Sequence, residues 1–221
     1  MEHLVKILEK KWLSHNVMSV ILDKPRDYTF TIGQAIELTI VTEGLRVGSA
    51  PFTLTSLPNW PNLELMIKIY PEHQGVTWAL SEHEVYDSVG ITNAWDSYEY
   101  NGPGVFIAGG SGITPFIPMI RDLNIKKALN NHKLIHANRN SKDVIMAKEL
   151  KNALGGHYLN ILSRERCPGH NFGRIDGNYL KQQIDDFDQN FYLCGPDAFS
   201  ERIQGSLIRL GAKKEKIQIG Y

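Results

Sequence analysis

A glycine-rich segment at residues 109–115 is the first candidate for chemistry, and it reads Gly109-Gly110-Ser111-Gly112-Ile113-Thr114-Pro115. It directly follows an apolar run at residues 105–108 and opens an amphipathic stretch. A glycine turn between a strand and a helix lets the backbone approach a pyrophosphate, and the helix N-terminus presents free N–H groups. The spacing departs from the dinucleotide-binding fingerprint, because Pro115 stands where a third glycine is expected. A nucleotide-binding loop and a plain strand-to-helix turn are therefore both open.

The cysteines and histidines give no sign of a metal centre. Cys167 and Cys194 are the two cysteines of the chain and form no CxxC pair, whereas a cysteine-ligated iron–sulfur cluster needs four such ligands. His132 and His136 are four residues apart, but they straddle a turn and a predicted strand rather than sharing one helix face. We expect neither a metal site nor a disulfide scaffold.

The second half of the chain alternates between strands and helices. Such alternation predicts a parallel sheet with helices on both faces. We predict strands at residues 105–108, 133–137, 158–162, 190–193 and 217–219, and helices at residues 116–123, 147–154, 178–186 and 198–210.

The first hundred residues instead contain short β-type runs between turn residues, which is typical of a small antiparallel β-barrel. The change of pattern at residues 101–104 predicts two domains, residues 1–101 and 102–221, and we expect the four tryptophans of the first domain to lie mostly in its core. Strands are predicted at residues 4–8, 17–22, 35–41, 52–55 and 63–70, turns at residues 24–25, 32–34, 47–48 and 57–59, and one helix from about residue 75 through residue 80.

Composition excludes several classes of protein. The chain has 221 residues, of which 42% are hydrophobic and 22% charged, so it is neither disordered nor of low complexity. Its 24 basic residues balance its 24 acidic residues, which argues against a nucleic-acid-binding protein. No apolar run is long enough to cross a bilayer, and the first residues lack the layout of a signal peptide. We expect a cytoplasmic protein.

The glycine segment resembles the nicotinamide-nucleotide loop of the ferredoxin/flavodoxin–NAD(P)H reductase family. Other segments resemble that family in the same order along the chain, so the resemblance covers nearly the whole sequence. They are Phe30-Thr31-Ile32-Gly33-Gln34, Ala50-Pro51-Phe52-Thr53-Leu54-Thr55-Ser56, Gly75-Val76-Thr77, Asn138-Arg139-Asn140-Ser141-Lys142-Asp143 and Leu193-Cys194-Gly195-Pro196.

The resemblance implies a flavin-binding β-barrel, residues 1–101, with FAD favoured over FMN. It assigns the apolar platform for the flavin to Phe52 and a hydrogen-bonding hydroxyl to Thr53, although an ordinary pair of strand residues is the alternative. The family usually has an arginine for the flavin diphosphate where this chain has Ala50, and Arg46 or Lys68 could compensate. Further flavin contacts are implied at Gly75, Val76, Thr77 and the terminal Tyr221.

The resemblance also implies an α/β nicotinamide-nucleotide domain, residues 102–221. A Ser-Arg pair contacts the 2′-phosphate of NADP in related reductases, which favours NADPH over NADH, with a solvated basic loop as the alternative. Cys194 would lie beside the nicotinamide as a positioning element rather than a nucleophile, or be only a buried structural cysteine. The implied nucleotide contacts are Gly110, Ser111, Gly112, Thr114, Pro115, Arg139, Ser163, Arg164, Arg174, Cys194, Gly195 and Pro196.

The function implied by the resemblance is an oxidoreductase that takes hydride from NAD(P)H onto a flavin. The electrons would pass to a flavodoxin, a ferredoxin or a similar acceptor, and Thr53 and Cys194 are the residues expected at the reacting rings. A non-catalytic nucleotide-binding or regulatory relative that has lost tight flavin binding is the alternative, because of Ala50.

Overall fold

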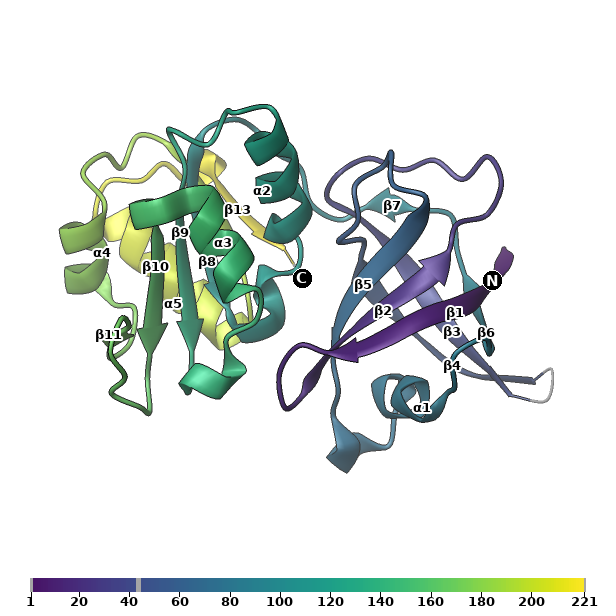
Figure 1. Ribbon diagram of the computed structural model, residues 1–221. Coiled ribbons are helices and arrows are strands. Elements are labelled where there is room, and N and C mark those ends of the chain that lie inside the picture. Colours follow the sequence, from purple (N-terminus) through teal and green to yellow (C-terminus); the bar gives the residue numbers. More distant parts are fainter. Residues whose placement is uncertain (1, 43–44, 221) are drawn as a thin grey trace. The chain divides into compact units, whose positions relative to one another are not determined.

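The computed structural model describes residues 2–42 and 45–220 (Figure 1). The chain forms two compact units, whose main boundary along the sequence lies between Glu99 and Tyr100, with Ile117–Met119 grouped with the first unit. An antiparallel sheet makes up the first unit and a parallel sheet with helices the second. The fold class predicted from the sequence is therefore confirmed.

The sheet of the first unit has the strand order β4-β3-β6-β1-β2-β5, with β7 paired to β3, and all of its pairings are antiparallel. A short 3-10 helix, η1 (Pro71–His73), and helix α1 (Val76–Glu82) follow β5. The strands are β1 (His3–Trp12), β2 (Val17–Asp23), β3 (Gln34–Thr42), β4 (Leu45–Thr53), β5 (Asn62–Lys68), β6 (Ser88–Ile91) and β7 (Trp95–Asp96).

The two end strands of this sheet, β4 and β5, are joined just beyond the end of β4. The N–H of Thr55 donates to the carbonyl oxygen of Glu64 at 2.8 Å, and its hydroxyl donates to a carboxylate oxygen of the same residue at 2.8 Å. The N–H of Glu64 donates to the hydroxyl of Ser56 at 3.1 Å. Because all three residues are buried, these bonds draw the edges of the sheet together around its apolar core.

Two predictions for the first unit are wrong. The turn expected at residues 47–48 is not formed, because these residues lie inside β4. Gly48, which suggested a chain reversal, instead lies next to a register shift opposite Ile40 and Val41. The side chains of Trp12 and Trp95 are not in the core, since they are 54% and 43% exposed. Both lie in strands whose outward face meets solvent, and position along a strand decides burial more than residue type does.

The second unit is a six-stranded parallel sheet, in the order β11-β10-β9-β8-β12-β13. Its strands are β8 (Gly104–Gly109), β9 (Lys133–Asn138), β10 (Tyr158–Leu162), β11 (Asn171–Phe172), β12 (Asn190–Cys194) and β13 (Ile217–Gly220). Helices α2 (Phe116–Ile125), α3 (Ala147–Leu154), α4 (Gly177–Gln183) and α5 (Asp197–Arg209) connect them, and short 3-10 helices are η2 (Gly110–Ile113), η3 (Ser141–Asp143), η4 (Gly155–His157) and η5 (Lys214–Lys216).

Both faces of the parallel sheet are covered by helices. Leu180 of α4 and Ile203 and Leu207 of α5 pack in one core cluster with Val105, Ile107 and Ile135 of the sheet. Helix α3 lies on the opposite side of the sheet from α5 (Figure 1). An ion pair between Arg121 Nε of α2 and Glu149 Oε1 of α3, at 2.7 Å, links the two helices that precede and follow β9.

The order of the strands places a topological switch at β8. The chain proceeds from β8 to β9, β10 and β11 on one side, and then returns to β12 and β13 on the other. In open parallel sheets ligands bind outside the carboxyl ends of the strands at such a switch. The segments that follow β8 and β12 are therefore the first place to look for a site.

Candidate functional site

The glycine segment lies at the switch, as the turn from β8 through η2 to α2. Gly110 has a φ of +58°, a backbone conformation that favours glycine, and a Cβ atom placed on it would meet nothing within 4 Å. Ser111, Gly112 and Thr114 are half-buried, whereas Pro115 is buried and occupies the N-cap position of α2. The loop therefore has one side open at Gly110.

The segment after β12 packs directly against this loop. A Cβ atom on Gly112 would lie 2.4 Å from the carbonyl oxygen of Cys194 and 2.7 Å from the nitrogen of Gly195. A Cβ atom on Gly195 would in turn lie 3.1 Å from the Cα of Gly109. Gly112 and Gly195 are required because two backbone segments meet here. The sequence alone did not reveal this requirement.

Cys194 is held as a neutral thiol in this contact. Burial raises the pKa of the Cys194 thiol to about 11, against a weaker opposing effect of the Gly195 N–H. The thiolate, which is the nucleophilic form, is therefore scarce at neutral pH. This agrees with a positioning role for Cys194, next to the exposed Pro196.

Three arginines follow three neighbouring strands of the same sheet. Arg139 comes directly after β9, Arg164 follows β10 by two residues, and Arg174 follows β11 by two residues. The N–H of Arg164 donates to the carbonyl oxygen of Arg139 at 2.9 Å, and the N–H of Gly173 donates to that of Leu162 at 2.9 Å, so the parallel register continues past the strands. All three arginines are exposed. We call these residues the arginine row.

Within residues 2–42 and 45–220, no acidic side chain forms an ion pair with a member of the arginine row. Ser163 lies beside the row, and its hydroxyl donates to the carbonyl oxygen of Asn138 at 3.3 Å while keeping its lone pairs. An arginine fork binds phosphate oxygens through two parallel hydrogen bonds. The row is thus chemically suited to a phosphate group.

Glu165 ties the loop that carries Arg164 to the loop after β9. Its carboxylate accepts the N–H of Ser141 at 2.6 Å and the hydroxyl of Ser141 at 3.1 Å. These two bonds hold the pKa of the Glu165 carboxyl below its ordinary value. The carboxylate that lies between Arg164 and Arg166 in the sequence is thus engaged with Ser141 of the neighbouring loop.

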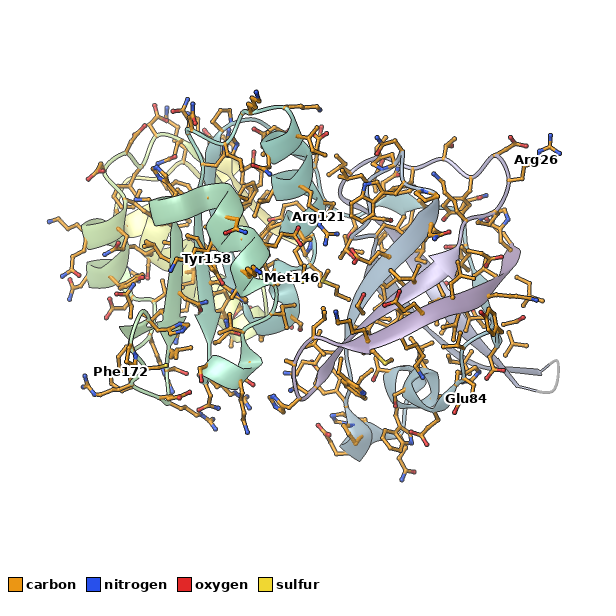
Figure 2. All side chains as sticks on the ribbon, viewed as in Figure 1. Arg26, Glu84, Arg121, Met146, Tyr158 and Phe172 are labelled. Atoms are coloured by element: carbon orange, nitrogen blue, oxygen red, sulfur yellow. The ribbon has the colours of Figure 1, made fainter. Side chains whose placement is uncertain are left out.

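Phe172 on the edge strand β11 is an exposed aromatic ring that sequence reasoning missed. The side chain is 48% exposed and labelled at the outer end of the sheet in Figure 2. The guanidinium carbon of Arg166 lies 4.1 Å from its ring centroid, a cation–π contact. The signal in the sequence was weak, because a two-residue strand has no readable period.

Most of the flavin residues expected from the sequence belong to the first unit. Phe52 and Thr53 are half-buried at the end of β4, and Phe52 packs against the apolar core with Val76 of α1. A Cβ atom on Gly48 would lie 3.0 Å from Cγ2 of Val76, so the first turn of α1 crosses β4 two residues before Ala50. Gly75 caps α1 in an extended conformation, and the hydroxyl of Thr77 accepts the N–H of Tyr70 at 3.4 Å.

No contact among the described residues tests whether Lys68 compensates for Ala50, so that expectation stays a prediction. The Nζ of Lys68 lies 5.1 Å from the ring centroid of Tyr70. The side chain of Arg46 and the whole of Tyr221 lie outside the described residues. The expectations for Arg46 and Tyr221 therefore stay predictions.

Residues 106–205 match the family described as the oxidoreductase NAD-binding domain. Among curated proteins, the chain is 33% identical over 130 residues to a flavohemoprotein of Bacillus cereus, which covers 54% of this chain and 32% of that protein. It is 26% identical over 216 residues to the glycine betaine monooxygenase reductase subunit of Pseudomonas aeruginosa, covering 90% of this chain and 58% of that protein. The chain thus spans about a third and about three fifths of these relatives.

Two solved structures share the whole fold. The flavohem-like FAD/NAD-binding domain of nitric oxide dioxygenase from Vibrio cholerae superposes with a TM-score of 0.86 at 23% identity, covering 99% of this chain and 97% of that one. A ferredoxin NADP+ reductase from Neisseria gonorrhoeae, solved with bound FAD and NADP, gives a TM-score of 0.83 at 19% identity, covering 98% and 97%. Both likenesses are to a chain made of the same two units in the same order.

Proposed function

We propose that this chain is a reductase of the ferredoxin–NAD(P)H reductase type, which oxidises NAD(P)H and delivers the electrons to an acceptor protein. The match to the oxidoreductase NAD-binding domain and the fold shared with solved flavin reductases support the proposal. The observation that carries the proposal is the backbone contact between Gly112 and Cys194 at the switch point of the parallel sheet. It joins the two segments that bound the crevice where such sheets bind nucleotides. FAD, when bound, supplies the redox chemistry, since it accepts hydride from a nicotinamide and releases single electrons.

The residues of the first unit fit a flavin in part. Phe52 offers an apolar ring at the end of β4, and the adjacent Thr53 offers a hydroxyl with no side-chain partner among the residues described. A flavin needs such a platform and such a hydrogen bond near its reactive nitrogen. Ala50 supplies no charge for a diphosphate, so we propose that flavin binds less tightly here than where an arginine occupies that position.

We propose NADPH as the preferred donor because of the arginine row. The 2′-phosphate distinguishes NADPH from NADH, and Arg164 with Arg139 and Arg174 on either side offers exposed forks for it. At the end of β9, where an acidic side chain would hold an unmodified ribose, the chain has Asn138, and Arg139 follows it. Phe172, one of whose faces is covered by Arg166, offers a ring against which a base could stack.

The electron acceptor is proposed to be a small carrier protein such as a flavodoxin, a ferredoxin or a similar redox partner. Relatives named for such roles include a monooxygenase reductase subunit and a ferredoxin NADP+ reductase. No helix within the described part of the chain is long and apolar enough to cross a membrane. The formal net charge of zero gives no overall preference for an acidic carrier, so a local basic patch would have to steer it.

Anaerobic mixing of the FAD-loaded protein with NADPH, and separately with NADH, tests the proposal. We expect the flavin absorption band to bleach with both donors and faster with NADPH, and a panel of one-electron acceptors should then restore it. Protein that binds NADPH but takes up no FAD would favour the alternative, a nucleotide-binding regulatory relative, for which Ala50 is the motivating residue. Protein that binds neither would defeat both.

A further inference from the structure

A buried histidine on β9 contacts the glycine loop. His136 is fully buried and pairs in register with Ala108 of β8, whose small side chain leaves room for the imidazole beside it. The Nε2 atom of His136 lies 2.9 Å from the carbonyl oxygen of Gly110. Because a carbonyl oxygen only accepts, Nε2 carries the proton and donates it. The Nδ1 atom has no partner among the residues that the structure describes.

This hydrogen bond fixes the peptide plane between Gly110 and Ser111. In a trans peptide the C=O and the N–H point in opposite directions. With the carbonyl of Gly110 turned toward the buried imidazole, the N–H of Ser111 points away from it. Gly110 itself has a left-handed backbone conformation, and its Cβ position faces open space. This side of the loop is therefore accessible to a ligand.

We propose, on the basis of the function proposed above, that His136 is a positioning residue that holds the Gly110–Ser111 peptide in the orientation that binds the nucleotide pyrophosphate. The imidazole touches no nucleotide itself. It turns one backbone carbonyl inward, and thereby removes a negative dipole end from the side on which the phosphates would lie.

The protonation state of His136 suits this role. Burial lowers the pKa of His136 to about 4, against the weaker opposing effect of its bond to Gly110. The ring is therefore neutral at pH 7 and can keep a single proton on Nε2. A neutral donor in a dry environment forms this bond without a buried charge.

Two amide variants test the proposal, with binding of NADPH to the flavin-free and the FAD-loaded protein as the readout. The amide nitrogen of Gln reaches about as far from the backbone as Nε2, whereas that of Asn reaches only as far as Nδ1. We expect His136→Asn to raise the Kd for NADPH about tenfold and His136→Gln to stay within about threefold of the original chain. FAD binding should be unchanged in both.

His132→Leu is the matched control, because His132 is also a buried histidine next to β9 but bonds the hydroxyl of Tyr100 at 2.7 Å. It should lower the melting temperature without changing the Kd for NADPH. Equal Kd values for the Asn and Gln variants, or a comparable rise in His132→Leu, would show that His136 is merely structural and overturn the proposal. If the original chain binds neither NADPH nor NADH, the proposed function itself fails, and that outcome is distinct.

Discussion

A Cβ atom on Gly112 would lie 2.4 Å from the carbonyl oxygen of Cys194. This distance is far shorter than any real contact, so the two backbone segments can meet only when residue 112 is a glycine. The contact joins the ends of β8 and β12, which neighbour each other in the sheet. Gly112 is therefore required by the packing of the fold, whereas Gly110, whose Cβ position is open, lies on the free side of the loop.

The two glycines should therefore respond differently to substitution. Gly112→Ala is expected to destabilise the second unit by about 1–3 kcal/mol, the usual cost of overpacking, and to abolish nucleotide binding because the loop must shift. Gly110→Asn should keep most of the stability, since asparagine tolerates a left-handed backbone, but should weaken nucleotide binding through its side chain on the open side. Denaturant unfolding and NADPH titration of both variants check this.

FAD binding serves as the control for both glycine variants, because it is assigned to the other unit and should survive. Equal losses of FAD and NADPH binding would contradict the assignment of the loop. Gly110→Asn with unaltered NADPH affinity would mean that the nucleotide approaches from another side.

Arg164→Ala should raise the KM for NADPH by about 10- to 100-fold while changing the KM for NADH much less. A charge-assisted hydrogen bond contributes about 1.5–3 kcal/mol, and only NADPH carries the 2′-phosphate. Arg166→Ala is a charge-matched control, because Arg166 is engaged with the ring of Phe172 and should affect the two donors alike. Identical effects of Arg164→Ala on both donors would place recognition of the 2′-phosphate elsewhere.

The arginine row also illustrates how much the sequence could predict. Ser163 and Arg164 were identified from the motif order, and the strand before them, residues 158–162, was predicted at its observed ends. Arg174 was proposed only as a second donor, and the strand before it was not predicted. That Arg139 and Arg174 flank Arg164 depends on the parallel register of β9, β10 and β11. Strand β11 has only two residues, too few for any periodicity, so its exposed Phe172 could not be anticipated.

Other misses have the same physical origin in long-range pairing. The short strands β6 and β7 were not predicted, because their pairing with β3 stabilises them more than their own sequences do. Similarly, the need for glycine at position 112 arises from a segment more than eighty residues away. The role we propose for His136 likewise depends on neighbouring strands rather than on the spacing of histidines.

The buried His136 predicts a specific dependence of stability on pH. Its pKa is about 4 in the folded chain and about 6.5 in an unfolded one. The unfolded state therefore takes up a proton first as the pH falls, so the free energy of unfolding should decrease between pH 6.5 and pH 4. The upper limit of this loss, approached below pH 4, is about 3–4 kcal/mol, from 1.36 kcal/mol per pKa unit.

Denaturant unfolding of the original chain and of His136→Gln at several pH values isolates this contribution, because all other groups are common to both. The difference in unfolding free energy between the two proteins should change between pH 6.5 and pH 4 and be constant above pH 7.5. A difference that is flat over the whole range would mean that His136 titrates normally in the folded state.

Cys194 should be inert to alkylation near neutral pH. Its thiol pKa of about 11 leaves about one molecule in ten thousand as thiolate at pH 7. Treatment with iodoacetamide at pH 7 followed by peptide mapping should therefore leave Cys194 largely unlabelled, although it is half-buried rather than fully buried, and Cys194→Ser should keep a measurable rate of flavin reduction. Rapid labelling of Cys194 with loss of activity would contradict a neutral, positioning thiol.

Ala50→Arg is expected to tighten FAD binding. Ala50 lies on the same face of β4 as Gly48, whose Cβ position is 3.0 Å from Val76 in the first turn of α1. An arginine there would bring a guanidinium to the position that the resemblance assigns to the flavin diphosphate. The gain should be about 1.5–3 kcal/mol, measured as slower release of FAD on dialysis and a lower Kd.

Ala50→Gln separates charge from added contact area, because it lengthens the side chain without a charge and should give a smaller gain. Raising the salt concentration should reduce the gain of Ala50→Arg only moderately if the pair is partly buried. Weaker FAD binding by Ala50→Arg would instead indicate that another cation already fills this place and repels the new one. Arg46 would then be the first residue to substitute, since it lies in the same strand.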